Sequence, residues 1–191
     1  MRTTKLAGAL AVLLGGCQTG GAAKPPSATA GPGAAGTDWM NPPAVPAALA
    51  VPAGSTLKLH AHGAGAQIYA CGATGWTLKA PDAKLFDAAG AQVGTHEAGP
   101  TWSANDGSAA VAKKIAEAPA PDPAAVAWLL LQVVSNRGTG TFSDVTYVQR
   151  VGTAGGKAPA GGCDAAAPGT REVSYTAEYY FYAGSPAQAG H

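Results

Sequence analysis

Apolar and polar residues alternate in short stretches along most of the chain. The clearest stretch is Arg171–Tyr182, where alternate positions carry Val173, Tyr175, Ala177, Tyr179 and Phe181. The same period recurs in residues 56–62, with Leu57, Leu59 and Ala61 on one face and Lys58, His60 and His62 on the other. A period of two is typical of a β-strand with one buried and one exposed face. The pattern therefore predicts a sheet whose two faces differ in polarity.

Other short runs of strand-forming residues lie between turn signals. They predict strands at residues 67–71, 76–79, 83–87, 92–96, 102–104, 108–115, 127–134 and 143–151. Gly63-Ala64-Gly65 predicts a turn after the first strand, and Asn105-Asp106-Gly107 is the strongest hairpin signal. A helix within residues 106–118 is the alternative there. The long apolar run 127–134 predicts a strand that is buried on both faces.

Strands at short intervals with frequent turns predict an all-β fold, either an antiparallel β-sandwich or a barrel, with long Gly/Pro-rich loops. The 27 glycines and 15 prolines among 191 residues agree with this turn-rich class. We expect a single β-domain at residues 46–184, a Gly/Ala/Pro loop at 152–169 and a disordered tail at 185–191. Only 12% of residues are charged and the net charge is +1, so no basic surface for nucleic acid is expected.

The N-terminus has the features of an export signal. Basic residues precede a short apolar run that ends in Leu14-Gly15-Gly16-Cys17, which resembles a bacterial lipobox. The resemblance implies a lipoprotein signal peptide at residues 1–16 and lipid, such as palmitate, on Cys17. An ordinary signal peptide with a chance cysteine is the alternative. By resemblance to the sorting rule of Gram-negative bacteria, Gln18 favours the outer membrane. Residues 17–45 predict a flexible tether, in which Trp39 is either loose or docked on the domain.

If Cys17 carries lipid, Cys71 and Cys163 are the remaining cysteines. Two leftover cysteines in an exported chain most simply pair, so we predict a Cys71–Cys163 disulfide. Two buried free thiols are the alternative. No cysteine spacing typical of a zinc site is present.

Several motifs occur together across the predicted domain. They are Gly65-x-Gln67-x-Tyr69-x-Cys71 with Trp76, Gly94-x-His96-x-x-Gly99-Pro100-x-Trp102, Trp128-Leu129-Leu130-Leu131, Val148-Gln149-Arg150 and Tyr175-x-x-x-Tyr179-x-Phe181-Tyr182. This series resembles the DUF3455 family, an uncharacterised family of secreted bacterial and fungal proteins, over about residues 45–184. The resemblance implies no established activity, cofactor or catalytic residue. A dehydrogenase label attached to some fungal members finds no dinucleotide-binding motif here.

One function to consider is an exported hydrolase. His96 and Asp106 lie ten residues apart, and Ser103 and Ser108 are the candidate nucleophiles nearby. His96 and Glu97 would point to opposite faces of a strand, and no Gly-x-Ser-x-Gly motif is present. The structural alternative is that Asp106 forms the turn and Trp102 fills the core.

Another function to consider is metal binding. His60 and His62 would lie on one strand face about 7 Å apart, a spacing that suits two imidazole ligands of copper or zinc. No third ligand is evident, and two exposed histidines are the alternative.

Aromatic residues are candidates for lining a ligand groove. The ligand-binding candidates are Tyr69, Trp76, His96, Trp102, Tyr180 and Tyr182. An aromatic core is the alternative. The leading hypothesis is a non-enzymatic lipoprotein, exported and anchored by lipid to the cell envelope, whose β-domain binds an envelope polymer, a small ligand or a protein. No cofactor and no nucleic acid are expected.

Overall fold

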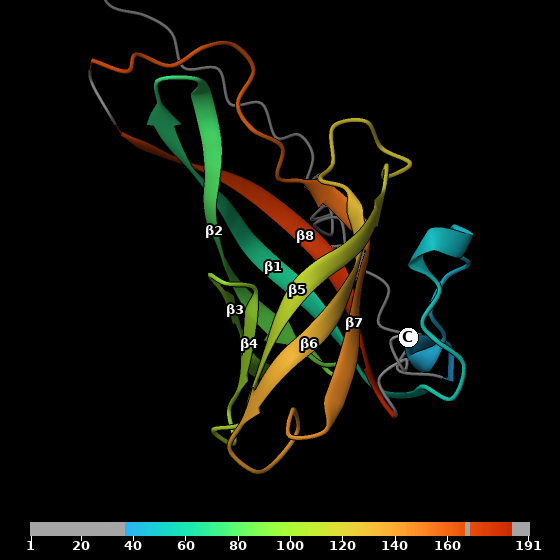
Figure 1. The fold of residues 1–191 in the computed structure, drawn as a ribbon. Helices are drawn as coiled ribbons and strands as arrows, with labels where there is room; N and C mark the ends of the chain where they lie inside the picture. The colour runs from blue at the N-terminus through green and yellow to red at the C-terminus, as the bar shows by residue number, and fades with distance from the viewer. Residues whose placement is uncertain (1–36, 167–168, 185–191) are drawn as a thin grey trace, which may run out of the picture. The chain divides into compact units, whose positions relative to one another are not determined.

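The structure, a computed structural model, describes residues 37–166 and 169–184 (Figure 1). The predicted signal peptide, Cys17, most of the predicted tether and the predicted tail lie outside the described residues. The described part contains two short 3-10 helices, η1 (Thr37–Met40) and η2 (Ala47–Leu49). Its strands are β1 (Thr56–Gly72), β2 (Gly75–Phe86), β3 (Gln92–Glu97), β4 (Thr101–Ala104), β5 (Ala109–Ala118), β6 (Trp128–Arg137), β7 (Val145–Gly155) and β8 (Thr170–Ala183).

The strands form one antiparallel sheet in which each strand pairs with the next along the chain. β8 also pairs with β1 over most of its length, so the sheet closes into a barrel (Figure 1). This confirms the predicted all-β fold and selects the barrel from the two predicted architectures. No helix among the described residues is long and apolar enough to cross a membrane.

The predicted turn at residues 63–65 is wrong, because β1 runs through it without a break. The two glycines serve close packing instead. A Cβ on Gly65 would lie 2.1 Å from the backbone oxygen of Asp82, and one on Gly63 would lie 2.5 Å from the ring of Tyr179. A glycine within a strand often marks a place where another chain segment approaches closely.

Residues 109–118 form β5, which confirms the predicted strand at 108–115 over its helical alternative. Three other local predictions need correction. β7 extends to Gly155, into the predicted loop. Within β6, Leu131 faces the barrel interior and Leu130 packs outside, but Val134 is 56% exposed, so the strand is not buried throughout. In β1, a bulge after Leu57 places that side chain in the outer cluster while Leu59 stays inside.

One end of the barrel interior is filled by aromatic and aliphatic side chains. Phe142, from the β6–β7 connection, is 1% exposed and packs against Phe181 with ring centroids 4.8 Å apart. The nearby loops are tied together, because Asp106 accepts hydrogen bonds of 2.7 Å from both the backbone nitrogen and the hydroxyl of Thr141. This end of the barrel is therefore closed.

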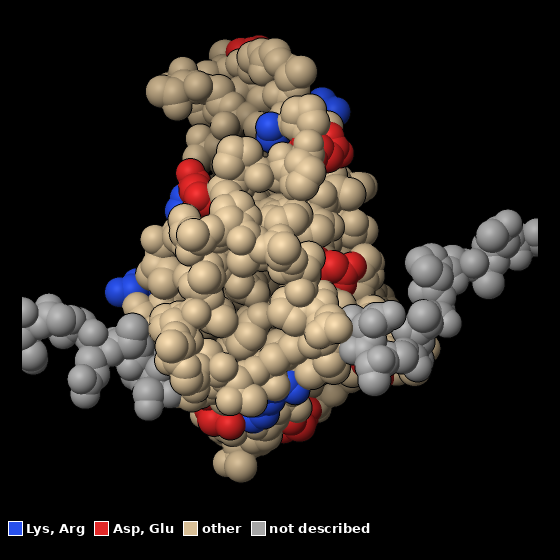
Figure 2. All heavy atoms as spheres, turned by 90° about the vertical axis from the view of Figure 1, so that its right-hand side faces the viewer, with Lys and Arg blue, Asp and Glu red and all other residues tan. Residues whose placement is uncertain are grey.

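The segment before β1 covers part of the outer surface. Leu49 is fully buried against a second apolar cluster that includes Tyr147, Tyr180 and Tyr182. Trp39 stacks on His60 with centroids 4.0 Å apart, so Trp39 is docked on the domain. The face shown in Figure 2 is largely uncharged, with scattered acidic and basic side chains.

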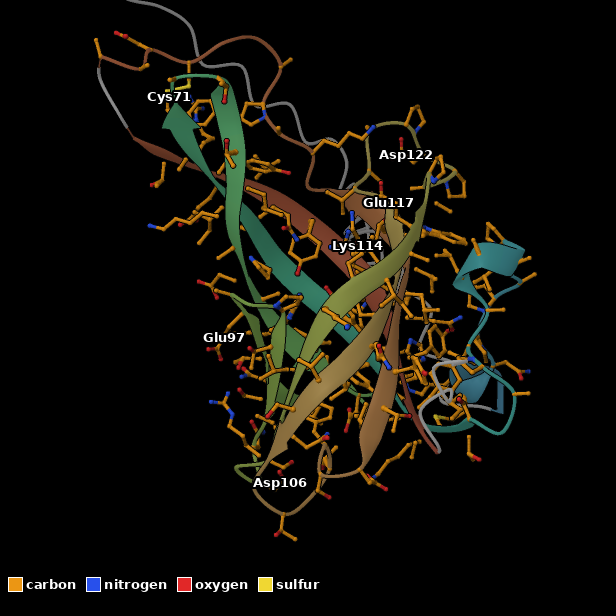
Figure 3. All side chains as sticks on the ribbon, viewed as in Figure 1. Cys71, Glu97, Asp106, Lys114, Glu117 and Asp122 are labelled. Atoms are coloured by element: carbon orange, nitrogen blue, oxygen red, sulfur yellow. A yellow bond between two sulfur atoms is a disulfide. The ribbon has the colours of Figure 1, made fainter. Side chains whose placement is uncertain are left out.

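The predicted disulfide is confirmed. Cys71, near the end of β1, is bonded to Cys163 in the β7–β8 connection, 92 residues later in the sequence. In Figure 3, Cys71 and Asp106 mark opposite ends of the barrel. The disulfide therefore fastens the long β7–β8 connection to the end that the aromatic core does not fill.

Candidate functional site

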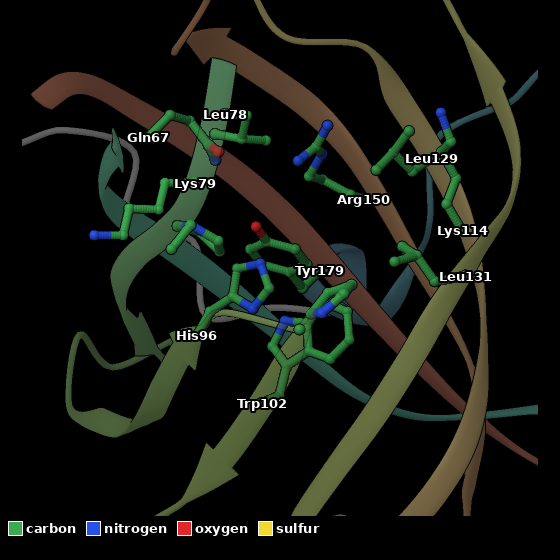
Figure 4. A pocket seen from close by; sticks show the side chains of 14 residues that line it. Gln67, Leu78, Lys79, His96, Trp102, Lys114, Leu129, Leu131, Arg150 and Tyr179 are labelled. Atoms are coloured by element: carbon green, nitrogen blue, oxygen red, sulfur yellow. The ribbon is translucent and has the colours of Figure 1, made fainter. Parts of the chain in front are cut away.

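A cavity of about 200 Å³ lies in the part of the barrel beyond the aromatic core (Figure 4). Every strand contributes to its wall, so residues far apart in the sequence meet there. The lining comprises Gln67, Leu78, Lys79, Ala80, Pro81, His96, Gly99, Pro100, Trp102, Lys114, Leu129, Leu131, Arg150 and Tyr179.

The lengths of β3 and β4 explain where the wall is incomplete. β2 pairs with β3 only from Ala83 to Phe86, and β5 pairs with β4 only from Ala109 to Val111. The remaining parts of β2 and β5 have no strand partner on that side. The cavity lining includes Leu78 and Lys114 from these parts, both of them exposed, and Gly99 and Pro100 from the turn between β3 and β4. This side of the barrel gives access to the cavity.

Buried polar donors line the cavity without a protein partner. Gln67 and Trp102 are each 1% exposed, yet Gln67 Nε2 and Trp102 Nε1 have no hydrogen-bond partner among the described residues. The same holds for Nε of Arg150. The large majority of buried side-chain polar atoms in proteins are hydrogen-bonded, so three such donors around one cavity need an explanation.

Arg150 is a half-buried cation with no carboxylate partner among the described residues. Its Nη2 donates a 2.8 Å hydrogen bond to the backbone oxygen of Ala127. No aspartate or glutamate lines the cavity. Lys114 also reaches the wall, but it forms an exposed ion pair with Glu117. Lys79 is a lining residue too, but it is exposed. Arg150 is therefore the main uncompensated charge that is partly buried at the cavity.

His96 is a neutral group in the cavity wall. Its Nδ1 lies 2.9 Å from the backbone oxygen of Thr101, so this nitrogen is the one that carries hydrogen. Burial lowers the pKa of His96 to about 4, which leaves the ring uncharged at pH 7. The ring stacks on Trp102 with centroids 4.5 Å apart and planes 5° from parallel. Nε2 thus offers a lone pair, and the stacked rings form a flat apolar wall.

Tyr179 provides a hydroxyl to the cavity. Its oxygen lies 3.2 Å from the hydroxyl oxygen of Tyr175, an inward-facing residue of the same strand. Burial raises the pKa of Tyr179 well above its ordinary value, and the charge of Arg150 and its hydrogen bond to the phenol oppose this rise only in part. Tyr179 therefore stays a neutral phenol and does not serve as a counter-ion for Arg150.

Comparison with known proteins identifies the family. The family model described as "Protein of unknown function (DUF3455)" matches residues 52–183, which are β1 to β8 with the residues just before them. The chain belongs to the DUF3455 family. Searches of curated proteins and of solved structures found no match. The resemblance in the sequence motifs is thereby confirmed.

The candidate catalytic residues of this DUF3455 chain do not come together. His96 pairs with Trp102 across β3 and β4, whereas Asp106 lies in the turn that follows β4. Ser108 Oγ donates to Asp106 at 2.5 Å and accepts from the backbone nitrogen of Phe142 at 3.0 Å. The hydrogen bond from Ser108, with others from Thr141, holds the pKa of Asp106 well below its ordinary value. Asp106 and Ser108 therefore fasten the closed end.

The other residues considered for hydrolysis are also apart from His96. Ser103 pairs with Thr95, and neighbouring pairs in a sheet point to opposite faces, so Ser103 points away from the interior. Glu97 is exposed and accepts a 2.7 Å hydrogen bond from Thr95. The described residues thus show no serine within hydrogen-bond reach of His96.

The histidines considered as metal ligands surround a carboxylate on the outside of the barrel. His60 Nε2 lies 2.7 Å from one oxygen of Glu178, and His62 Nδ1 lies 2.8 Å from the other. Burial alone would raise the pKa of Glu178, but its contacts with the histidines lower it below the ordinary value. His60 is 4% exposed and stacks between Trp39 and Tyr180. No group of three metal-binding side chains with suitable geometry was found in residues 37–166 and 169–184.

The candidate aromatic residues do not form one groove. His96 and Trp102 line the cavity, but Tyr180 and Tyr182 lie in the outer cluster beneath the segment before β1. Tyr69 is buried and donates a 2.7 Å hydrogen bond to the backbone oxygen of Gly156. Trp76 is half-buried near the end of β2. Of the six candidates, two therefore belong to the cavity.

Sequence reasoning missed Gln67, Arg150 and Tyr179 as site residues. All three occupy inward-facing strand positions, since Gln67 pairs with Pro81 and Arg150 pairs with Tyr179. The sequence signal that could have found them is a polar residue two positions away from an inward-facing apolar residue of the same strand. Arg150 follows Val148 by two residues in this way.

Proposed function

We propose that the DUF3455 domain is a non-enzymatic binding protein that holds a small organic molecule inside the barrel. The observation that supports this most directly is the pair of buried donors, Gln67 Nε2 and Trp102 Nε1, that lack protein partners beside the cavity. Small-molecule sites combine apolar walls with a few placed polar groups, which matches this lining. Eight-stranded barrels are also large enough to hold one small ligand.

The hydrolase alternative has less support. Nucleophilic hydrolysis needs a nucleophile and a base within hydrogen-bond reach, with a third group that orients the base. His96 hydrogen-bonds a backbone oxygen, and the hydroxyl of Ser108 is engaged by Asp106 and Phe142. The donors in the cavity instead suit recognition of a ligand without chemistry on it.

The binding proposal is tested at the mouth of the cavity. Leu78 is 50% exposed and lines the cavity, so Leu78→Trp is expected to narrow the access without disturbing the core. The wild type is screened by thermal shift against small single-ring compounds of each charge. A ligand at a hundredfold its Kd adds about 2.7 kcal/mol and raises Tm by several degrees.

Compounds that stabilise the wild type should lose most of this effect with Leu78→Trp. The matched control is Val134→Trp, because Val134 is 56% exposed and does not line the cavity. Equal stabilisation of the wild type and both variants would place binding elsewhere and contradict the proposal.

We further propose that the chain is exported and anchored by lipid on Cys17. The support is the resemblance of Leu14-Gly15-Gly16-Cys17 to a lipobox and the low-complexity stretch after it. More than one acyl chain on Cys17, at about 0.8 kcal/mol per buried CH₂, would hold the protein firmly to a membrane. In bacteria that express the full chain, Cys17→Ser is expected to move the protein from the membrane fraction to the soluble or unprocessed fraction. Unchanged membrane association with Cys17→Ser would refute the anchor.

A further inference from the structure

We propose that the ligand of this cavity is a small monocarboxylate with an apolar body, and that Arg150 binds its carboxylate together with the donors of Gln67 and Trp102. This inference rests on the proposed function and adds the chemical class of the ligand. It follows from the charge in the cavity, from the kinds of hydrogen-bonding groups there, and from the size and polarity of the remaining wall.

Arg150 places a positive charge inside the barrel. Its register partners are Leu129 on β6 and Tyr179 on β8, both of which line the cavity, so Arg150 faces the interior. A cation taken out of water is costly unless an anion accompanies it. No carboxylate pairs with Arg150 in the described part of the chain. An anionic ligand would supply the missing charge.

The hydrogen-bonding groups of the cavity also favour an anionic ligand. An ionised carboxylate only accepts hydrogen bonds, and Gln67 Nε2, Trp102 Nε1 and Arg150 Nε are all donors without partners. The planar guanidinium suits a carboxylate particularly well, because it can bind both oxygens. Water can satisfy these donors until a ligand displaces it. A ligand with an amine instead of a carboxylate would leave these donors unpaired and would place its positive charge next to that of Arg150.

The number of cations in the wall favours a single negative charge. Lys114 is already paired with Glu117, and Lys79 is exposed, with its side chain directed away from the other labelled residues in Figure 4. One guanidinium therefore remains for the ligand. A carboxylate matches this supply, whereas a doubly charged phosphate monoester would require more donors and cations than the cavity offers.

The rest of the cavity wall indicates that the body of the ligand is apolar. Apolar lining comes from Leu78, Pro81, Pro100, Leu129 and Leu131, and the His96–Trp102 stack adds a flat surface. A dry apolar cavity of about 150 Å³ holds benzene. The volume of about 200 Å³ found here suits one aromatic ring or a medium-length aliphatic chain.

The test uses three molecules that share a body and differ in charge. They are 3-phenylpropanoate, its neutral amide and 3-phenylpropylamine, measured by isothermal titration calorimetry at pH 7 on the oxidised protein. We expect the carboxylate to bind at least about tenfold more tightly than the amide, because it gains charge-assisted hydrogen bonds. The amine should bind more weakly than the amide.

Arg150 is tested with two variants and a matched control. Arg150→Gln should reduce the preference for the carboxylate over the amide to about twofold or less, while the amide still binds. Arg150→Lys should retain an intermediate preference, because it keeps the charge and loses the planar fork. Arg137→Gln is the control, since Arg137 is exposed and does not line the cavity. If Arg150→Gln does not fold, Arg150→Lys and the wild-type series still decide.

The outcomes separate this inference from the proposed function. Equal binding of the carboxylate and the amide, or tighter binding of the amine, overturns the inference that the ligand is a carboxylate. The proposed binding function is unaffected by that result. An unchanged carboxylate preference in Arg150→Gln overturns the role of Arg150. If none of the three binds, and octanoate, octanamide and octylamine also fail, the proposed small-molecule function is itself overturned.

Discussion

Removal of the Cys71–Cys163 disulfide is expected to lower the free energy of unfolding by about 4–5 kcal/mol. The bond joins residues 92 positions apart, so it closes a loop that spans most of the barrel. In the chain-entropy model, a loop of about 100 residues gives close to 4.7 kcal/mol, because the bond restricts the unfolded chain. Net stabilities of domains are about 5–15 kcal/mol, so the loss would remove a large share of the total.

The measurement is urea unfolding of the oxidised protein and of the double variant Cys71→Ser/Cys163→Ser. Replacing both cysteines avoids a leftover thiol that forms mixed disulfides. The midpoint should fall strongly for the variant, and reduced wild type should behave like the variant. A loss below about 1 kcal/mol would contradict the entropic account and indicate that the bond restrains only the β7–β8 connection.

The inward-facing residues of β8 were predictable from the sequence. Tyr175, Ala177, Tyr179 and Phe181 were assigned to one face by their period, and all four lie in the inner cluster. The prediction succeeded because closure of the sheet buries one face, and period two then fixes which side chains point inward. β8 pairs with both β1 and β7, so its register is specified on both sides.

Glycines were the main source of error in the fold. Gly63 and Gly65 have the same sequence signature as a turn, yet they lie within β1. Whether a glycine makes a turn or allows close packing depends on the neighbouring strand, here the backbone of Asp82 and the ring of Tyr179. Those partners are distant in sequence, so local pattern alone does not distinguish the two roles.

The candidate site was predictable only in part. His96 and Trp102 stood out as chemically distinctive residues, and they do line the cavity. The sequence did not reveal which part of the interior would remain open. That depends on Phe142, which fills the other end from a connection far from β3 and β4 in the sequence. What marks Arg150 as a site residue is that no carboxylate pairs with it among the described residues. This is a tertiary feature that the local sequence does not show.

Trp102→Ala is expected to lower the free energy of unfolding by about 3–5 kcal/mol, the range for large-to-small changes of a buried tryptophan. Trp102 is 1% exposed and contacts His96, Tyr179 and Phe181 through its ring. The space left by the side chain would join the existing cavity, where neighbouring polar groups can bind water. The cost should therefore fall near the lower end of that range.

Trp102→Phe separates packing from ligand recognition. It keeps an aromatic ring and removes Nε1, which has no protein partner, so no hydrogen bond within the described structure is lost. We expect a loss of about 1–2 kcal/mol from reduced buried area, measured by urea unfolding. If Nε1 donates to the carboxylate, Trp102→Phe should also weaken 3-phenylpropanoate binding by about tenfold and leave amide binding less affected.

Trp76→Phe is the matched control, because Trp76 is half-buried and does not line the cavity. It should leave the preference for the carboxylate unchanged. A Trp102→Phe variant that is as stable as expected but binds the carboxylate as tightly as the wild type would remove Nε1 from the site. Trp102 would then act as a wall of the cavity, and carboxylate recognition would depend on Arg150 and Gln67.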